Sequence, residues 1–478
     1  MMLLAMTLPL EIAPAAPLVK DSQELIKSSL HLIDNWLDYQ VYIDEIPGLA
    51  VGIALEDELI FKKEYGYANL KKKSRLTDQH LFRIASQSKI FTATAIMMLY
   101  HEGKLSIDDK VSKHLPWFQS AKDKQLEHIR IHHLLTHSSG ITRDGNTGHW
   151  FTHKFPTLKE IKAQFQEKIA FLEPSEIHKY SNFGYTLLGQ IIENVSGQSY
   201  ADFIQKRILS PLGMQNTVVD VDETNLARHA TGYKPKIPKQ ERKPFDHIPA
   251  NIMSPATGLS STVEDLIKFY QAHLFGNDSL LPDYIKREMQ RPHVSRGDFG
   301  TVSTKARGLG FAIEKIGNYT LVGHSGGYNG FVTDSVLIQD QKIVIVVLCN
   351  PGSASALLRK IVKIFNKLEK NRKEFLVEDQ ENRPDFSSII GFYADADEWQ
   401  ILLYSQIGSK LVSIEPGLDN PMDFFGIFKH EQDYRFVETK ENYTYYPGES
   451  FEFVDSPEGE KVLIESHKGK MFPYKFKY

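Results

Sequence analysis

Cysteine is almost absent from this sequence, since the 478 residues contain a single one, Cys349. One thiol cannot form an internal disulfide or a cysteine-based metal site, and its position directly after the apolar run 343–348 favours a buried, inert side chain. An excess of charge of one sign is also lacking, because the formal net charge is −4 and the pI is near 6.5. We therefore expect no nucleic-acid partner.

Long hydrophobic runs are missing as well. No stretch approaches the roughly 18 to 20 apolar residues that a membrane span requires, so we expect none. Residues 1–16 contain an apolar patch, but no Lys or Arg precedes it and Pro9 and Glu11 interrupt it. Residues 1–20 are therefore a poor secretory signal and are interpreted as an N-terminal tail. The compartment stays open: we lean toward the cytoplasm, with export through an atypical signal as the alternative.

Hydrophobic residues make up 41% of the chain and charged residues 24%, which is the profile of an ordinary soluble globular protein. Two runs around Asp57-Glu58 predict a hairpin, and four more strands are predicted late in the chain, with mainly helical patterns between. These strands are predicted over 49–55, 59–66, 308–315, 319–325, 332–339 and 342–350. The expected fold class is therefore α/β in the mixed, α+β sense, with one antiparallel sheet and a helical insertion.

The character of the chain changes near its C-terminus. A charged segment that is poor in apolar residues predicts a linker over 374–385. Beyond it, residues 386–478 show strand signals every eight to twelve residues and are rich in Tyr and Phe, which predicts a small all-β barrel or sandwich. The expected organisation is a tail, a catalytic domain over 21–373, the linker and this β domain.

The stretch around Ser86 combines a hydroxyl with an amine. Residues 90–99 read as a buried helix, so Ser86 lies at its first turn, where unpaired N–H groups collect. Lys89 follows at i+3 on the same face, and burial would lower the pKa of its amine. A hydroxyl, an amine that takes its proton and backbone donors are the parts of an acyl-transfer site. The alternative is a helix-capping serine beside a lysine that reaches water.

Two further short motifs supply groups that such a site needs. Tyr180 and Asn182 lie two residues apart before a predicted helix, so a phenol for proton relay and an amide for a substrate carbonyl project from one loop. His324, Gly326 and Gly327 end a predicted strand, where glycines let a substrate backbone approach closely. We expect the N–H of Gly327 to join that of Ser86 as an oxyanion pair.

Three histidines, His132, His133 and His137, invite a metal interpretation. No acidic residue lies near them at the spacing of a metal ligand, and they belong to a short predicted helix that ends in a Ser-Ser-Gly turn. We therefore expect neither a metal nor another cofactor.

Three short motifs of this chain resemble, in the same order, the three motifs of serine β-lactamases and penicillin-binding proteins. They are Ser86-x-x-Lys89, Tyr180-x-Asn182 and His324-x-Gly326. The class C-like branch, with D-aminopeptidases, D,D-carboxypeptidases and esterases, is the most similar. The resemblance covers roughly residues 21–373, and the stretches 134–140 and 256–261 support it. Some peptidase-like members carry a C-terminal lipocalin-like barrel, which is similar to the predicted β domain.

The resemblance implies that Ser86 is the acylated nucleophile and that Lys89 with Tyr180 supplies base and acid. It implies that Asn182 and the strand of His324 position the substrate. Penicillin-recognising members usually have Lys-Thr-Gly where this chain has His324-Ser325-Gly326, and an imidazole holds a carboxylate more weakly near pH 7.

We therefore expect a serine hydrolase for D-amino-acid peptides or small esters. A β-lactamase or D,D-carboxypeptidase is the first alternative, and a non-catalytic sensor or scaffold of the same fold is the second. The expected partners are a small-molecule or short-peptide substrate and, as an open prediction, further copies of this chain.

Overall fold

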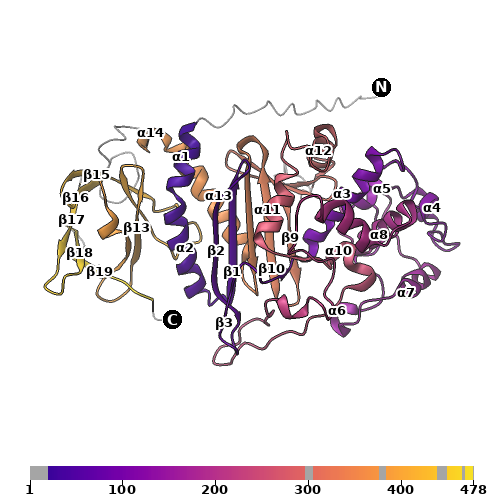
Figure 1. Ribbon diagram of the computed structural model, residues 1–478, viewed down its shortest axis with the longest axis horizontal. Helices are drawn as coiled ribbons and strands as arrows, with labels where there is room; N and C mark the ends of the chain where they lie inside the picture. Colours follow the sequence, from indigo (N-terminus) through magenta and orange to yellow (C-terminus); the bar gives the residue numbers. More distant parts are fainter. Residues whose placement is uncertain (1–19, 296–304, 376–383, 439–448, 466–468, 477–478) are drawn as a thin grey trace, which may run out of the picture.

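The computed structural model describes residues 20–295, 305–375, 384–438, 449–465 and 469–476. An antiparallel sheet stands between two groups of helices, and a β-barrel lies beyond one of these groups (Figure 1). The predicted fold class, with its mixed sheet and helices followed by a barrel, is confirmed. Almost all of the predicted N-terminal tail and residues 376–383 of the predicted linker lie outside the described residues.

Nine strands form the central sheet in the order β3-β2-β1-β11-β10-β9-β8-β7-β6. The N-terminal hairpin joins the late strands through β1 and β11, where Leu49 pairs with Cys349 and both strands are buried throughout. The strands are β1 (Gly48–Leu55), β2 (Glu58–Asn69), β3 (Ser74–Arg75), β6 (Val294–Ser295), β7 (Lys305–Arg307), β8 (Ala312–Ile316), β9 (Tyr319–Tyr328), β10 (Phe331–Ile338) and β11 (Ile343–Cys349). Their apolar residues are β-branched, aliphatic or aromatic and fit a sheet that is covered on both faces.

Helices α1 (Lys20–Ser28), α2 (Leu30–Ile43) and α13 (Ala354–Lys370) cover the sheet face toward the barrel (Figure 1). The sequence predicts one helix over 21–39, and the structure divides it at Ser29. The hydroxyl of Ser29 donates to the carbonyl of Ile26 at 2.7 Å, so the side chain competes locally with the helical hydrogen bonds.

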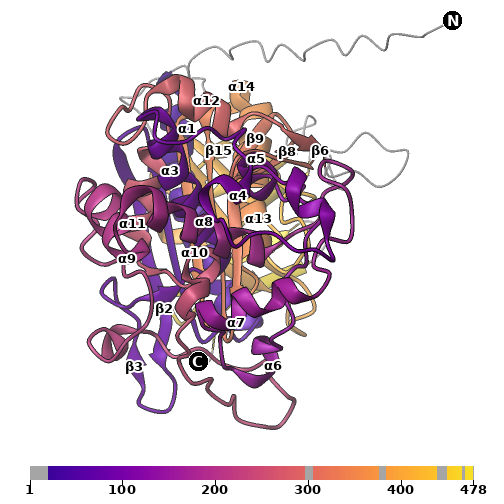
Figure 2. The same cartoon turned by 90° about the vertical axis from the view of Figure 1, so that its right-hand side faces the viewer.

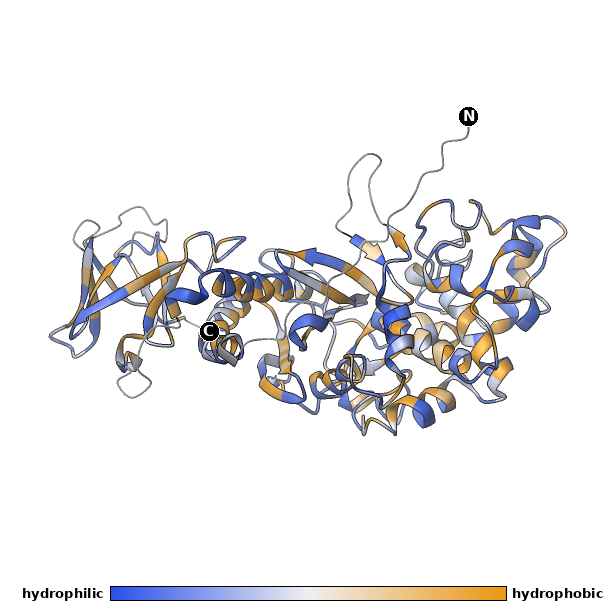
Figure 3. Cartoon of the chain, turned by 90° about the horizontal axis from the view of Figure 1, so that it is seen from above, coloured by the Kyte–Doolittle hydropathy of each residue, from blue (hydrophilic) through white to orange (hydrophobic). Residues whose placement is uncertain are grey.

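The other face of the sheet carries the helical insertion, which lies in front of the strands in Figure 2. Its centre is α3 (Ser88–His101), which is buried from residue 88 to residue 99 and packs against α8 (Asn182–Ser196) and α10 (Ser254–Thr257). The insertion also contains α4 (Val111–His114), α5 (Ile131–Leu135), α6 (His149–Thr152), α7 (Leu158–Ala163), α9 (Tyr200–Ile204), α11 (Val263–Gln271) and α12 (Asp283–Gln290), whereas α14 (Arg372–Phe375) lies on the barrel side beside α1. Hydrophobic residues gather in the helices that pack on the sheet (Figure 3).

The C-terminal strands close into an eight-stranded barrel. They are β12 (Gly391–Ala394), β13 (Ile401–Ile407), β14 (Lys410–Ile414), β15 (Gly426–Gln432), β16 (Arg435–Glu438), β17 (Ser450–Asp455), β18 (Lys461–Glu465) and β19 (Gly469–Pro473). Alternate side chains such as Tyr404 and Phe428 fill its interior with packed aromatic rings. Their neighbours, including Leu403 and Ile427, belong to the apolar cluster of α2 and α13. The barrel and the sheet domain therefore share a hydrophobic core.

Among the described residues, no helix combines the length and the apolar character that crossing a membrane demands.

Candidate active site

Ser86 lies in a single 3₁₀ turn, Ala85–Gln87, which leads directly into α3. The preceding residue, Ala85, is fully buried and has a φ of +54°, a left-handed conformation that costs a non-glycine residue on the order of 1 to 3 kcal/mol. The carbonyl of Leu259 accepts the N–H of Ile84 at 3.0 Å and fixes this segment from outside. The predicted location of Ser86 at a helix start is confirmed, and the surrounding structure holds a strained turn there.

The amine of Lys89 is completely buried beside the Ser86 hydroxyl. Its Nζ atom lies 3.3 Å from Ser86 Oγ, 2.7 Å from Asn182 Oδ1 and 2.7 Å from the carbonyl oxygen of Ala256. Burial holds the pKa of Lys89 well below its usual value, and the positive charges of Arg307 and Arg143 lower it further, although Asp144 opposes them. A neutral amine next to a serine hydroxyl is able to accept its proton.

Tyr180 contacts the same serine from the other side. Its hydroxyl donates to Ser86 Oγ at 2.9 Å, and its ring lies 4.2 Å from that of His137. Burial raises the pKa of Tyr180 to about 12, so the phenol stays protonated at neutral pH. The phenol is therefore suited to donate or relay a proton, whereas the amine of Lys89 is the stronger candidate for the base.

Asn182 is the first residue of α8, and the hydroxyl of Ser181 caps this helix by accepting the N–H of Gly184 at 2.8 Å. This cap fixes the start of the helix, where Asn182 Oδ1 accepts a hydrogen bond from Lys89 Nζ at 2.7 Å. The Nδ2 atom of Asn182 donates to Asp144 Oδ1 at 2.6 Å. Asp144 lies in the loop after α5, and no motif in the sequence analysis pointed to it.

His324 lies in β9 and is buried, with 5% of its surface exposed. Its Nδ1–H donates to the carbonyl of Ser325 at 2.6 Å. Burial, with the positive charge of Arg307, keeps the pKa of His324 well below its ordinary value, so the ring is neutral at pH 7. Arg307, which sequence reasoning missed, supplies a fixed positive charge close to it.

The two glycines that follow have different surroundings. A Cβ on Gly326 would lie 2.1 Å from the carbonyl oxygen of Ile84, so β9 packs tightly against the segment before Ser86 only because this side chain is absent. A Cβ on Gly327 would meet no atom within 4 Å. Gly326 therefore serves close packing, whereas the Cβ position of Gly327 faces open space.

The three histidines near α5 have separate local partners. His132 lies 3.1 Å from a carboxylate oxygen of Asp108, and the Nδ1 atoms of His133 and His137 accept the N–H groups of Arg130 and Ser181. In the described ranges, no group of three His, Cys, Asp or Glu side chains is arranged to hold a metal ion.

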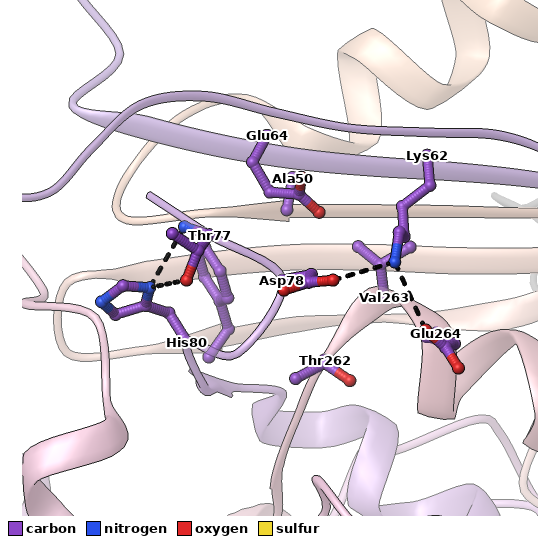
Figure 4. Close-up of a pocket in the computed structure, with 10 residues that line it drawn as sticks. Ala50, Lys62, Glu64, Thr77, Asp78, His80, Thr262, Val263 and Glu264 are labelled. Atoms are coloured by element: carbon purple, nitrogen blue, oxygen red, sulfur yellow. Dashed lines mark hydrogen bonds and ion pairs between the residues drawn. The ribbon is translucent and has the colours of Figure 1, made fainter. Parts of the chain in front are cut away.

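A small cavity lies away from these residues, between β2 and the start of α11 (Figure 4). Its free volume of about 10 Å³ admits about one water molecule. Lys62 crosses it and pairs with Asp78 at 3.0 Å and Glu264 at 3.3 Å. The pair with Glu264 connects β2 with α11, the pair with Asp78 connects β2 with the segment after β3, and the cavity contributes nothing to the site around Ser86.

Fold and site together define the class of this protein. The chain belongs to the Beta-lactamase family, whose model matches residues 33–360. It is 30% identical over 357 residues to Protein flp of Staphylococcus aureus strain MRSA252, covering 73% of this chain and 68% of that protein. It is 29% identical over 321 residues to Penicillin-binding protein 4* of Bacillus subtilis strain 168, covering 64% of this chain and 68% of that protein.

Solved structures show the same fold. The octameric penicillin-binding protein homologue of Pyrococcus abyssi has a TM-score of 0.62 at 23% identity and covers 92% of this chain and 99% of its own. The D-amino acid amidase of Ochrobactrum anthropi SV3, solved with D-phenylalanine, has a TM-score of 0.60 at 25% identity and covers 74% of this chain and 99% of its own. The resemblance to β-lactamases and penicillin-binding proteins is thus confirmed, as is the C-terminal barrel.

Proposed function

We propose that the protein is a serine hydrolase that forms an acyl-enzyme on Ser86. The observation that carries this proposal is that Ser86 Oγ lies within hydrogen-bond distance of both Lys89 Nζ and Tyr180 Oη, at 3.3 and 2.9 Å. The lowered pKa of Lys89 and the raised pKa of Tyr180 divide the two groups into base and acid.

In the first half of the reaction, Lys89 accepts the hydroxyl proton while Ser86 Oγ forms a bond to the substrate carbonyl carbon. The N–H groups of Ser86 and Gly327 are proposed to bind the oxyanion. When the bond to the leaving group breaks, the proton passes from Lys89 through Tyr180 to that group. In the second half, the oxygen of a water molecule forms a bond to the ester carbon, the bond from that carbon to Ser86 Oγ breaks, a proton of the water is transferred to Oγ, and the carboxylic acid leaves.

The proposed substrates are D-amino-acid amides, short D-peptides or small esters. A buried, neutral His324 replaces the cation that penicillin-recognising members present at this strand. The similarity to a D-amino acid amidase supports the same substrate class. The residues that we propose to line the substrate-binding site are Asn182, His324, Gly326 and Gly327.

A β-lactamase or D,D-carboxypeptidase is the second candidate, and the charge of Arg307 favours it. The positive charge of this buried guanidinium lowers the pKa values of Lys89, His137 and His324, so it lies close to all three. A fixed cation there is able to attract a substrate carboxylate in place of a lysine.

A fluorophosphonate probe, read by intact mass, tests the proposed nucleophile. We expect one adduct in the wild type and none in a folded Ser86→Ala variant. Kinetics with nitrocefin, a p-nitrophenyl ester and a D-alanyl anilide then distinguish the candidates, and faster turnover of the ester and anilide is expected. Adducts at other residues only, or no turnover of any substrate, would leave the non-catalytic sensor as the better interpretation.

We propose the domain boundaries expected from the sequence: a hydrolase domain over residues 21–373, a linker over 374–385 and a barrel domain over 386–478. The octameric relative supports a further proposal, that this chain forms a homo-oligomer. Light scattering coupled to size exclusion tests it, and a monomer at micromolar concentration would contradict it.

A further inference from the structure

The bonding capacity of the Lys89 amine is almost fully used by its neighbours. Asn182 Oδ1 and the carbonyl oxygen of Ala256, each 2.7 Å from Nζ, can only accept hydrogen bonds. A neutral amine has two N–H groups and one lone pair, so these two acceptors take both N–H groups. The lone pair is then left for the hydroxyl hydrogen of Ser86, whose oxygen lies 3.3 Å away.

This arrangement depends on which end of the Asn182 amide faces Lys89. If the NH₂ end faced the amine, it would donate to the lone pair that Ser86 requires. Asp144 Oδ1 lies 2.6 Å from the other end of the amide. Since a carboxylate only accepts hydrogen bonds, the NH₂ end must face Asp144, and the oxygen must face Lys89.

The Asp144 carboxylate is itself held in place. The indole N–H of Trp150 donates to Oδ1 at 3.0 Å, and Oδ2 lies 3.1 Å from the Nε atom of Arg143. With 21% of its side chain exposed, Asp144 is mostly withdrawn from solvent. A charged hydrogen bond of this kind is stronger than a neutral one, so the orientation of the Asn182 amide is firmly fixed.

We propose that Asp144 is a positioning residue: by holding the Asn182 amide in one orientation, it directs the Lys89 lone pair at Ser86. This inference rests on the proposed function, in which Lys89 accepts the Ser86 proton. Asp144 acts through Asn182 and takes no part in the transfer itself.

The charge of Asp144 adds a second, separable effect. It raises the pKa of Lys89 against the effect of burial. Removing this charge lowers the pKa of Lys89, so the amine stays neutral down to lower pH. The acid limb, which is the part of the pH profile where the acylation rate falls as Lys89 becomes protonated, therefore moves to lower pH. The other titratable or charged groups around Lys89 come from the loop after α5, from α8 and the residues before it, and from β7 and β9: His137, Arg143, Tyr180, Tyr185, Arg307 and His324.

The test is the rate at which the fluorophosphonate probe labels Ser86 between pH 5 and 10. For Asp144→Asn we expect the plateau of the labelling rate to be at least tenfold lower than in the wild type, because the Asn182 amide is free to turn. We also expect the acid limb to lie at lower pH. Asp334→Asn is the matched control, since Asp334 is 2% exposed and bonds Ser355 and Arg359 on the opposite face of the sheet. We expect it to lower the melting temperature and leave the acid limb unchanged.

An exchange of the two side chains separates positioning from folding. In the Asp144→Asn/Asn182→Asp double variant, the group beside Lys89 is a carboxylate that only accepts, so the lone pair stays directed at Ser86. The added charge near Lys89 moves the acid limb to higher pH. At pH values above this limb, we expect the double variant to label at least tenfold faster than Asp144→Asn. If Asp144→Asn does not fold, the comparison is with the wild type, and we expect the rate of the double variant to lie within tenfold of it.

The proposed role of Asp144 would be overturned if Asp144→Asn labelled at the wild-type rate with the wild-type pH dependence. It would also be overturned if the double variant did not recover the labelling rate. Failure of the wild type to label at Ser86 would instead overturn the proposed function.

Discussion

The hydroxyl of Tyr180 lies 2.9 Å from the Oγ atom of Ser86, although 94 residues separate them in the chain. Ser86 belongs to the turn that begins α3, and Tyr180 to the loop that precedes α8. The packing of α3 against α8 therefore sets the distance between the proposed nucleophile and its proton donor.

Lys89→Met and Tyr180→Phe are each expected to lower ester turnover on the order of 10²-fold or more, since each removes a group that transfers the proton. Steady-state kinetics measure this loss. Lys286→Met is the matched control, because Lys286 is equally buried and bonds the carbonyls of Leu274 and Asn277 away from the site. Turnover near the wild-type rate in both site variants would place the base elsewhere.

Gly326→Ala and Gly327→Ala are expected to differ although the residues are neighbours. The added methyl group at Gly326 meets a backbone oxygen at 2.1 Å, so we expect a lower melting temperature and loss of turnover. The methyl group at Gly327 meets open space, so its variant should melt like the wild type. Thermal melting of both proteins checks this, and equal destabilisation would contradict the packing argument.

The free energy of unfolding is expected to fall as the pH drops below 6.5, because several buried histidines are neutral in the folded protein. His273 is 1% exposed, and burial lowers its pKa to about 4 from an ordinary value of 6.5. The unfolded chain binds this proton more readily, so stability rises with pH in this window and is lost as the pH falls.

The contribution of His273 is on the order of 3 kcal/mol between pH 6.5 and 4. Urea unfolding across this range should show a shallower pH dependence in His273→Gln, with the same change at exposed His31 as the control. An unchanged slope would mean that His273 keeps its ordinary titration in the fold.

Leu403→Ala in the barrel is expected to destabilise the sheet domain as well, since Leu403 is fully buried in the cluster that includes α2 and α13. Truncation of a buried leucine costs about 2 to 5 kcal/mol. Calorimetry should show one transition that moves to lower temperature. Trp399→Ala, at a position that is 91% exposed, should leave it unchanged. Two transitions of which only one moves would show that the barrel unfolds independently.

Sequence reasoning reached much of the fold because local patterns carried it. The runs of β1 and β2 around a two-residue turn and the apolar strands β8 to β11 appear where their periodicity predicts them. The prediction of one continuous helix over 21–39 was wrong, because the chain forms two helices that are divided at Ser29. The hydroxyl of Ser29 donates to a nearby carbonyl, and the spacing of apolar residues gives no sign of such a hydrogen bond.

The i, i+3 spacing of Ser86 and Lys89 was by itself sufficient to place a hydroxyl and an amine on one face, because a helical turn brings such residues together. This feature depends on a few consecutive residues, and so the sequence determined it. The role of Gly326 was different: we expected it to let a substrate backbone approach, whereas in the structure it packs against the carbonyl of Ile84, which comes from a distant segment.

Only the tertiary structure decided how Lys89 is bonded and charged. Its partners Asn182 and Ala256 are 93 and 167 residues away, and Asp144 and Arg307 come from a loop and from β7, neither of which carries a motif of its own. Burial and long-range charge set the pKa of Lys89, and both arise when distant segments pack. The hydrophobic core that the barrel shares with α2 and α13 has the same origin, since it requires apolar side chains from both ends of the chain.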